Sequence, residues 1–313
     1  MDSGVRAKGP GMSAALPDDG TTCSGEAIVD AGPIRRRRRS AWSPEREVVV
    51  FFAASIVALW VLGLVVVAAQ MPYLLMALLG ASVPLVVAAG LIWRAEGTLR
   101  PLWGQLTRLG VAPRWYAAAI VVAVVAVVAA QLVIAVSGRE LAVEPFVPWW
   151  AIPLALPVFA VLLGGQEEPG WRGFALPRLQ QRFSAWSSSL IIGVVWAVWH
   201  VPMFVFDVVE DLPYLPYALV TVGLSVVYAW LFNSTDGAVP IAMTFHGAWN
   251  LAGLWLPGGD FAWWVMAVMV WAVALLLVAV YGAEDLARNG RARAAAEHRP
   301  NPAPSKPSAV EIG

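Results

Sequence analysis

The sequence predicts an all-α, polytopic membrane protein with about eight transmembrane helices. Of its 313 residues 59% are hydrophobic and only 13% are charged, and the mean hydropathy is +0.68. An ordinary soluble domain carries about 25% charged residues, so lipid is the expected solvent for most of this chain. Apolar runs near the length of about twenty residues that spans a bilayer occur at 48–69, 73–93, 115–137, 149–166, 185–206, 215–232, 238–256 and 261–282.

Two of these runs are weaker than the others. The fourth is short and contains Pro153 and Pro157, and the seventh, 238–256, contains polar residues. Tryptophan and tyrosine gather near the predicted ends, as interfacial anchors do. We find no internal repeat, so the inverted-repeat architecture of many transporters is not indicated.

Both ends of the chain have the composition of tails. Residues 1–46 and 285–313 are rich in small, charged and proline residues without apolar periodicity, so we predict disordered tails around a transmembrane domain at 47–284. The five arginines at 35–39 suggest a nucleic-acid patch, a twin-arginine export signal or a basic anchor beside the membrane. We expect the anchor and no nucleic-acid partner, because the next apolar run is long enough to span and no cleavage site follows. Cys23 has no second cysteine to pair with, which excludes disulfide chemistry.

The distribution of arginine predicts the orientation. An excess of lysine and arginine in short loops marks the cytoplasmic side. Loops between the second and third and between the fourth and fifth spans hold Arg94, Arg100, Arg108, Arg114, Arg172, Arg178 and Arg182. The opposite loops hold Arg139 and three acidic residues between 207 and 211. We therefore predict a multi-pass protein of the cell membrane with both termini in the cytoplasm.

The first candidate functional cluster is Gly164–Gly173, at the end of the fourth span. It contains the adjacent carboxylates Glu167 and Glu168, followed by Arg172. Adjacent carboxylates repel, so one of them is expected to hold a proton while Arg172 keeps the other ionised. This division suits acid–base chemistry. The alternative interpretation is an ordinary charged loop at the membrane interface.

Two further clusters place histidines inside predicted spans. His200 follows Trp196 in the fifth span, and His246 precedes Asn250 by four residues in the seventh, so the last two share a helix face. Each alone is explained by interhelical hydrogen bonding. Together with the glutamates, they are the components of a site that activates water. The third histidine, His298, lies in the tail.

The three clusters, in this order, resemble the CPBP family, which includes type II CAAX prenyl endopeptidases and bacteriocin-processing and abortive infection proteins. The matching motifs are E-E-x-x-x-R-G at 167–173, aromatic-x-x-x-His at 196–200 and H-x-x-x-N at 246–250, within residues 145–256. There are two departures: Trp196 stands where phenylalanine is common, and Pro169-Gly170 follows the glutamates, a pair that can break a helix.

The resemblance implies roles for these residues. Glu167 and His200 would activate water for attack on a peptide carbonyl, His246 and Asn250 would stabilise the oxyanion, and Glu168 and Arg172 would support the site. The expected mechanism needs no cofactor. The alternative is a catalytic zinc held by Glu167, His200 and His246.

One difficulty concerns depth in the membrane. Glu167 lies at the end of its predicted span, whereas His200 lies about 15 residues, or about 22 Å, into the next. Either that next helix begins later than Ala185 or the segment Gly164–Gly173 enters the membrane.

The sequence thus predicts an intramembrane endopeptidase with a cytoplasm-facing cavity, acting on a peptide or membrane-protein substrate of unknown identity. One alternative is a non-catalytic binding or immunity-type scaffold of the same fold. Another is a small transporter or channel that uses the same polar groups as an ion relay.

Overall fold

The computed structural model describes residues 42–141, 147–206, 212–256 and 259–288. Cys23, the arginines at 35–39, the acidic residues at 207–211 and His298 lie outside these ranges. Within them the regular structure is helical, with no strand, which confirms the predicted fold class. The elements are α1 (Pro44–Ala68), α2 (Tyr73–Glu96), α3 (Arg100–Leu106), α4 (Pro113–Val136), η1 (Trp149–Ala151), α5 (Ile152–Leu162), η2 (Gly165–Glu167), η3 (Pro169–Ala175), α6 (Leu176–Leu179), α7 (Ala185–Trp199), α8 (Val201–Val205), α9 (Tyr214–Ser234), α10 (Val239–Gly253) and α11 (Asp260–Tyr281).

Seven helical segments of the described chain are long and apolar enough to cross a membrane: Pro44–Ala68, Leu74–Glu96, Pro113–Val136, Trp149–Glu167, Ala185–Val205, Tyr214–Ser234 and Asp260–Tyr281. They coincide with seven of the eight predicted spans. The remaining prediction, 238–256, corresponds to α10, whose 15 residues make a helix shorter than the about twenty that span a bilayer.

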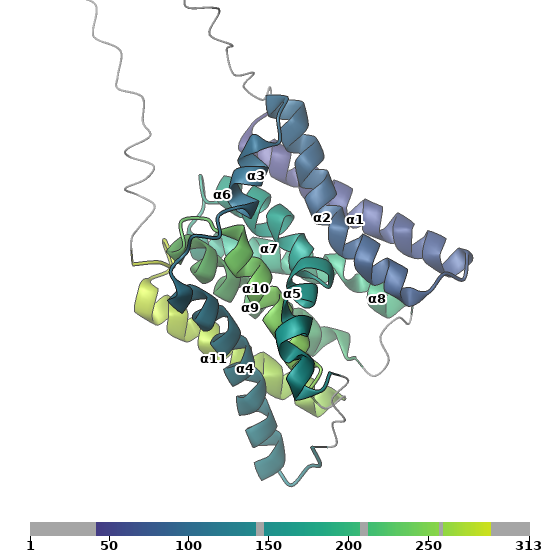
Figure 1. The fold of residues 1–313 in the computed structure, drawn as a ribbon, viewed down its shortest axis with the longest axis vertical. Coiled ribbons are helices and arrows are strands. Elements are labelled where there is room, and N and C mark those ends of the chain that lie inside the picture. The colour runs from purple at the N-terminus through teal and green to yellow at the C-terminus, as the bar shows by residue number, and fades with distance from the viewer. Residues whose placement is uncertain (1–41, 142–146, 207–211, 257–258, 289–313) are drawn as a thin grey trace, which may run out of the picture. The chain divides into compact units, whose positions relative to one another are not determined.

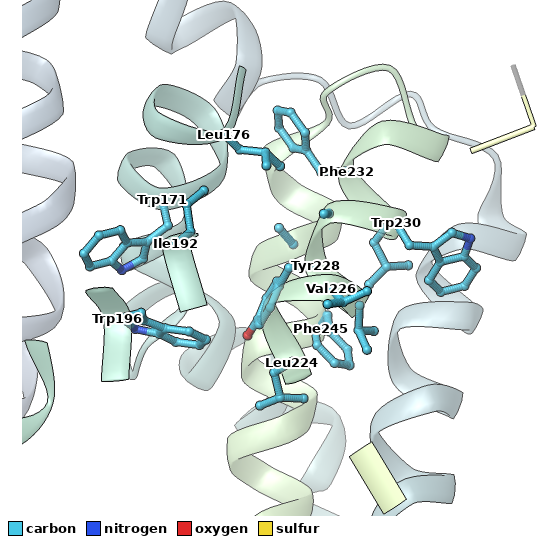
Figure 2. Packing of buried hydrophobic residues seen from close by; sticks show 14 of the residues in the cluster. Trp171, Leu176, Ile192, Trp196, Leu224, Val226, Tyr228, Trp230, Phe232 and Phe245 are labelled. Atoms are coloured by element: carbon cyan, nitrogen blue, oxygen red, sulfur yellow. The ribbon is translucent and has the colours of Figure 1, made fainter. Parts of the chain in front are cut away.

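The helices separate into an inner and an outer group. Helix α10 packs against α4, α5 and α9, while α9 also packs against α7 and α11 (Figure 1). A core of aromatic side chains from η3, α7, α9 and α10 fills the centre (Figure 2). By contrast, α1, α2, α4 and α11 leave large apolar side chains exposed, among them Val49, Val86, Val121 and Val268. Such faces are suited to contact with lipid acyl chains.

The fourth span changes helical geometry instead of ending. Helix α5 stops at Leu162, Gly164 takes the positive φ of 113°, and the chain continues through the 3₁₀ turn η2 and the π-helix η3 to Leu179. Pro169-Gly170 does not break this path, because Pro169 occupies the first turn of η3, where no intrahelical N–H donor is needed. At Gly170 the added Cβ of any other residue would lie 2.6 Å from the Pro84 carbonyl oxygen of α2, so glycine allows the close approach.

Because the fourth span continues past Glu167, Glu167 lies deeper in the bundle than the sequence suggested, at a depth closer to that of His200. Glu167 lies about three turns before the end of α6, and Trp196, four residues before His200, lies about three turns after the start of α7 and reaches Glu167 by a hydrogen bond. The two elements are joined by a short connection, so these residues reach the same level. Helix α7 begins at Ala185, and the segment Gly164–Gly173 enters the bundle.

Arg172 does not lie in the loop between the fourth and fifth spans, where the sequence predicted it. Arg172 is 1% exposed within η3 and is therefore not a loop cation. Arg178 and Arg182 stay near the surface, where they pair with Glu47 and Glu45 of α1 at 2.7 and 3.5 Å. The end of α6 and the beginning of α1 consequently lie at the same end of the bundle.

Candidate active site

Glu167 is held by two tryptophans. Its carboxylate oxygen Oε2 accepts hydrogen bonds from the indole Nε1 of Trp196 at 2.7 Å and of Trp171 at 3.2 Å. The side chain is only 4% exposed. Both hydrogen bonds reach this one oxygen. Glu167 is thus fixed in place through Oε2 by neutral donors.

Glu168 has a different environment, although it is the next residue. It is fully buried and accepts hydrogen bonds from the Arg172 guanidinium at 2.9 and 3.2 Å. Its Oε1 also lies 2.6 Å from Nδ1 of His246. The Arg172 guanidinium also donates a hydrogen bond to the hydroxyl of Ser225 at 3.0 Å, and its Cζ lies 3.8 Å from the centroid of the Tyr228 ring. The two adjacent carboxylates therefore have different partners: the Arg172 cation and His246 bind Glu168, whereas Glu167 has no cation at hydrogen-bonding distance among the described residues.

His200 is placed by Trp196 as well. It caps the end of α7, and its Nδ1 lies 2.8 Å from the Trp196 carbonyl oxygen, four residues earlier. A carbonyl only accepts, so Nδ1 carries the proton and the neutral ring leaves Nε2 as an acceptor. Trp196 thereby connects the two residues expected to activate water: its indole holds Glu167 and its carbonyl orients His200.

His246 and Asn250 meet on one face of α10, as their spacing predicts. A Cβ built on Gly164 would lie 2.4 Å from His246 Nε2 and 2.6 Å from Asn250 Nδ2, so both side chains face this glycine. Asn250 Nδ2 donates to the Leu163 carbonyl at 2.9 Å. The backbone at Leu163 and Gly164, where α5 ends, thus packs directly against the H-x-x-x-N motif.

Tyr228 also lies at the site, although no sequence motif points to it. Its ring is fully buried and lies 5.7 Å from the Trp196 ring and 5.9 Å from the His246 ring between centroids. Its hydroxyl has no hydrogen-bond partner among the described residues and points toward the Trp196 side (Figure 2). A single tyrosine in an apolar helix gives no sequence signal, because its importance arises from packing between helices.

The zinc alternative names Glu167, His200 and His246 as ligands. Among the described residues, no three histidine, cysteine, aspartate or glutamate side chains lie close enough to hold a metal ion. Glu167 Oε2 and His246 Nδ1 are directed at other partners. As placed, Glu167, His200 and His246 do not fit a zinc site.

Comparison with known proteins gives a result for the same region. Residues 148–252 match the family model of Rce1-like type II CAAX prenyl endopeptidases. The chain is also 27% identical over 103 residues to CAAX prenyl protease 2 of Methanococcus maripaludis, an alignment that covers 30% of this chain and 38% of that relative. The match spans well under half of the relative's length. The resemblance to the CPBP family is confirmed over this segment, which contains all six candidate site residues.

Proposed function

We propose that this membrane protein, whose residues 148–252 match the Rce1-like type II CAAX prenyl endopeptidases, is an intramembrane endopeptidase that uses Glu167 to activate water. The observation that carries the proposal is the unequal treatment of the two glutamates. Glu168 is bound by Arg172 and His246, whereas Glu167 is anchored through one oxygen by indole N–H groups. A carboxylate without a cationic partner is the stronger base.

Water activation follows from this arrangement. The second oxygen of Glu167, Oε1, accepts one proton of a water molecule, and the unprotonated Nε2 of His200 accepts a hydrogen bond from the other. The oxygen of the water attacks the peptide carbonyl carbon, and the proton taken by Glu167 passes to the leaving amine. Trp196 fixes the positions of Glu167 and His200 relative to each other because it forms a hydrogen bond with each.

His246 and Asn250 serve the developing oxyanion. Glu168 accepts a hydrogen bond from Nδ1–H of His246 and stabilises the imidazolium that forms when Nε2 is also protonated; in that form Nε2–H donates toward the carbonyl oxygen. Asn250 uses one amide hydrogen on the Leu163 carbonyl and retains the second for the same oxygen. Glu168 and Arg172 are accordingly positioning residues.

The orientation supports a cytoplasmic substrate. Hydrogen bonds join the start of α7 to Ala283 and Glu284, and Arg108 to the Asp236 carbonyl, so the arginine-rich ends of several spans gather at one end of the bundle. Arg139 lies at the other end of α4, over the Phe261 ring. By the positive-inside tendency the arginine-rich end is cytoplasmic, which is the side from which a cytoplasmic peptide would enter.

The experiment is a cleavage assay on the purified protein in detergent. Its substrates are a farnesylated peptide ending in a CAAX sequence, the same peptide without the lipid, and an unrelated transmembrane peptide, with products identified by mass spectrometry. We expect cleavage of at least one peptide by the wild-type protein and none by Glu167→Gln. Intact peptides throughout would favour the non-catalytic scaffold, and equal cleavage by both proteins would refute the role of Glu167.

A further inference from the structure

A cavity lies apart from the glutamates and histidines. It has a volume of about 550 Å³ and opens between the first turn of α4, the last turn of α9 and the segment that follows α11. Its lining comprises Arg114, Trp115, Ala118, Trp230, Asn233, Ser234, Asp236, Tyr281 and Arg288. None of these residues belongs to the proposed catalytic machinery.

The cavity wall contains buried polar groups that lack partners. Trp230 is 6% exposed and points away from the side of α9 that carries Tyr228 (Figure 2). Its indole N–H finds no acceptor in the described chain. Asn233 is 4% exposed and donates Nδ2 to the Asp285 carbonyl at 2.7 Å, yet its Oδ1 and the hydroxyl of Ser234 are also without partners there. Buried polar groups are normally satisfied, so this clustering indicates a ligand that supplies both acceptors and donors.

The charges around the cavity favour an anion. Arg114 and Arg288 line it together with a single carboxylate, Asp236, which leaves one positive charge in excess. The Arg288 guanidinium lies 5.6 Å above the Tyr281 ring, which directs it back along α11. An anionic oxygen would pair with the arginines and accept from Trp230, while hydroxyl groups of the same ligand would donate to Asn233 and Asp236.

The location favours a lipid over a soluble ion. Spans α4 and α11 begin and end beside the cavity, and α9 ends there too, so the cavity lies where membrane-spanning segments meet the headgroup layer. Trp115 and Trp230, whose rings lie 5.6 Å apart, are residues typical of that layer. Basic pockets between transmembrane helices recognise anionic headgroups.

We propose that this cavity binds the headgroup of an anionic glycerophospholipid, with the phosphodiester between Arg114 and Arg288 and the headgroup hydroxyls toward Asn233 and Asp236. Phosphatidylglycerol has this chemistry and serves as the probe. The inference does not depend on protease activity.

The test is native mass spectrometry of the purified full-length protein titrated with phosphatidylglycerol or phosphatidylcholine. We expect one tightly bound phosphatidylglycerol per chain and weaker binding of phosphatidylcholine. Arg114→Ala and Arg288→Ala should each lower the affinity about fivefold, the equivalent of about 1 kcal/mol for one arginine at the membrane surface. Trp230→Phe, which removes only the N–H donor and keeps a ring, should also weaken binding. Arg139→Ala, at the other end of α4, is the matched control and should bind as the wild type does.

Three outcomes would overturn the proposal: equal binding of the two lipids, wild-type affinity in all three cavity variants, or displacement of phosphatidylglycerol by soluble glycerol 3-phosphate at the same concentration. The last result would identify a free phosphate compound as the ligand. Arg114 and Arg288 are exposed, so their substitution should leave the melting temperature unchanged. The two arginine variants therefore still test the proposal if Trp230→Phe fails to fold.

Discussion

Replacement of Gly164 by alanine should stop catalysis without removing any catalytic group. The new methyl carbon would lie 2.4 Å from His246 Nε2 and 2.6 Å from Asn250 Nδ2, distances shorter than real contacts of a Cβ atom. Neither side chain can move away freely, because Glu168 holds His246 and the Leu163 carbonyl holds Asn250. The methyl group would therefore occupy the space proposed for the oxyanion.

The structure also sets the size of the effect. Loss of one oxyanion donor costs about 10²–10³-fold in turnover, and here two donors are obstructed, so a fall of at least about 10²-fold is expected. In addition, the φ of 113° at this position is unfavourable for alanine and should cost about 1–3 kcal/mol of stability. The melting temperature should fall, with the protein remaining folded at the assay temperature.

The assay measures the cleavage rate of Gly164→Ala against Gly90→Ala. Gly90 lies within α2, where an added Cβ meets no atom within 4 Å, so this control should keep wild-type turnover. Folded Gly164→Ala that cleaves at the wild-type rate would refute the placement of the oxyanion site against His246 and Asn250.

Three further predictions concern the support of the site, the topology and the metal. Glu168→Gln leaves the guanidinium of Arg172 buried without its counter-charge, so it should destabilise the protein by about 3–5 kcal/mol; a wild-type melting temperature would contradict this. In a Cys23→Ser background, a cysteine at Asp260 should react with an impermeant thiol reagent outside intact cells and one at Gln181 should not, and the reverse pattern would invert the orientation. Activity should survive prolonged treatment with a strong chelator; close to one zinc per chain by elemental analysis, with activity lost on chelation and restored by zinc, would overturn the metal-free mechanism.

Most of the fold could be predicted from the sequence because lipid imposes simple rules. A spanning helix needs a long apolar run, and seven such runs appear in the structure near their predicted limits. The exception, α10, is short because it is surrounded by other helices and its length is set by packing, not by the bilayer. Composition cannot distinguish these two causes of an apolar segment.

The candidate residues could be found from their motifs, but their pairing could not. The adjacent glutamates look equivalent in the sequence, and only the π-helical turn at Pro169–Ala175 directs Glu168 to Arg172 and His246 and Glu167 to Trp196. Arg172 was assigned to a loop because local hydropathy does not register an ion pair buried between helices. The double contact of Trp196 likewise depends on two elements distant in the sequence.

The most direct test of the central claim is the turnover of Glu167→Gln measured beside Glu47→Gln. Both changes replace a buried carboxylate of a membrane-spanning segment by its amide. Glu47, however, lies in α1 and pairs with Arg178 of α6, away from the histidines. We predict that Glu167→Gln lowers turnover of any cleaved substrate by at least about 10²–10⁴-fold, the usual effect of a lost general base, while Glu47→Gln keeps wild-type turnover per folded molecule. Wild-type turnover in folded Glu167→Gln would contradict the assignment of Glu167 as the base.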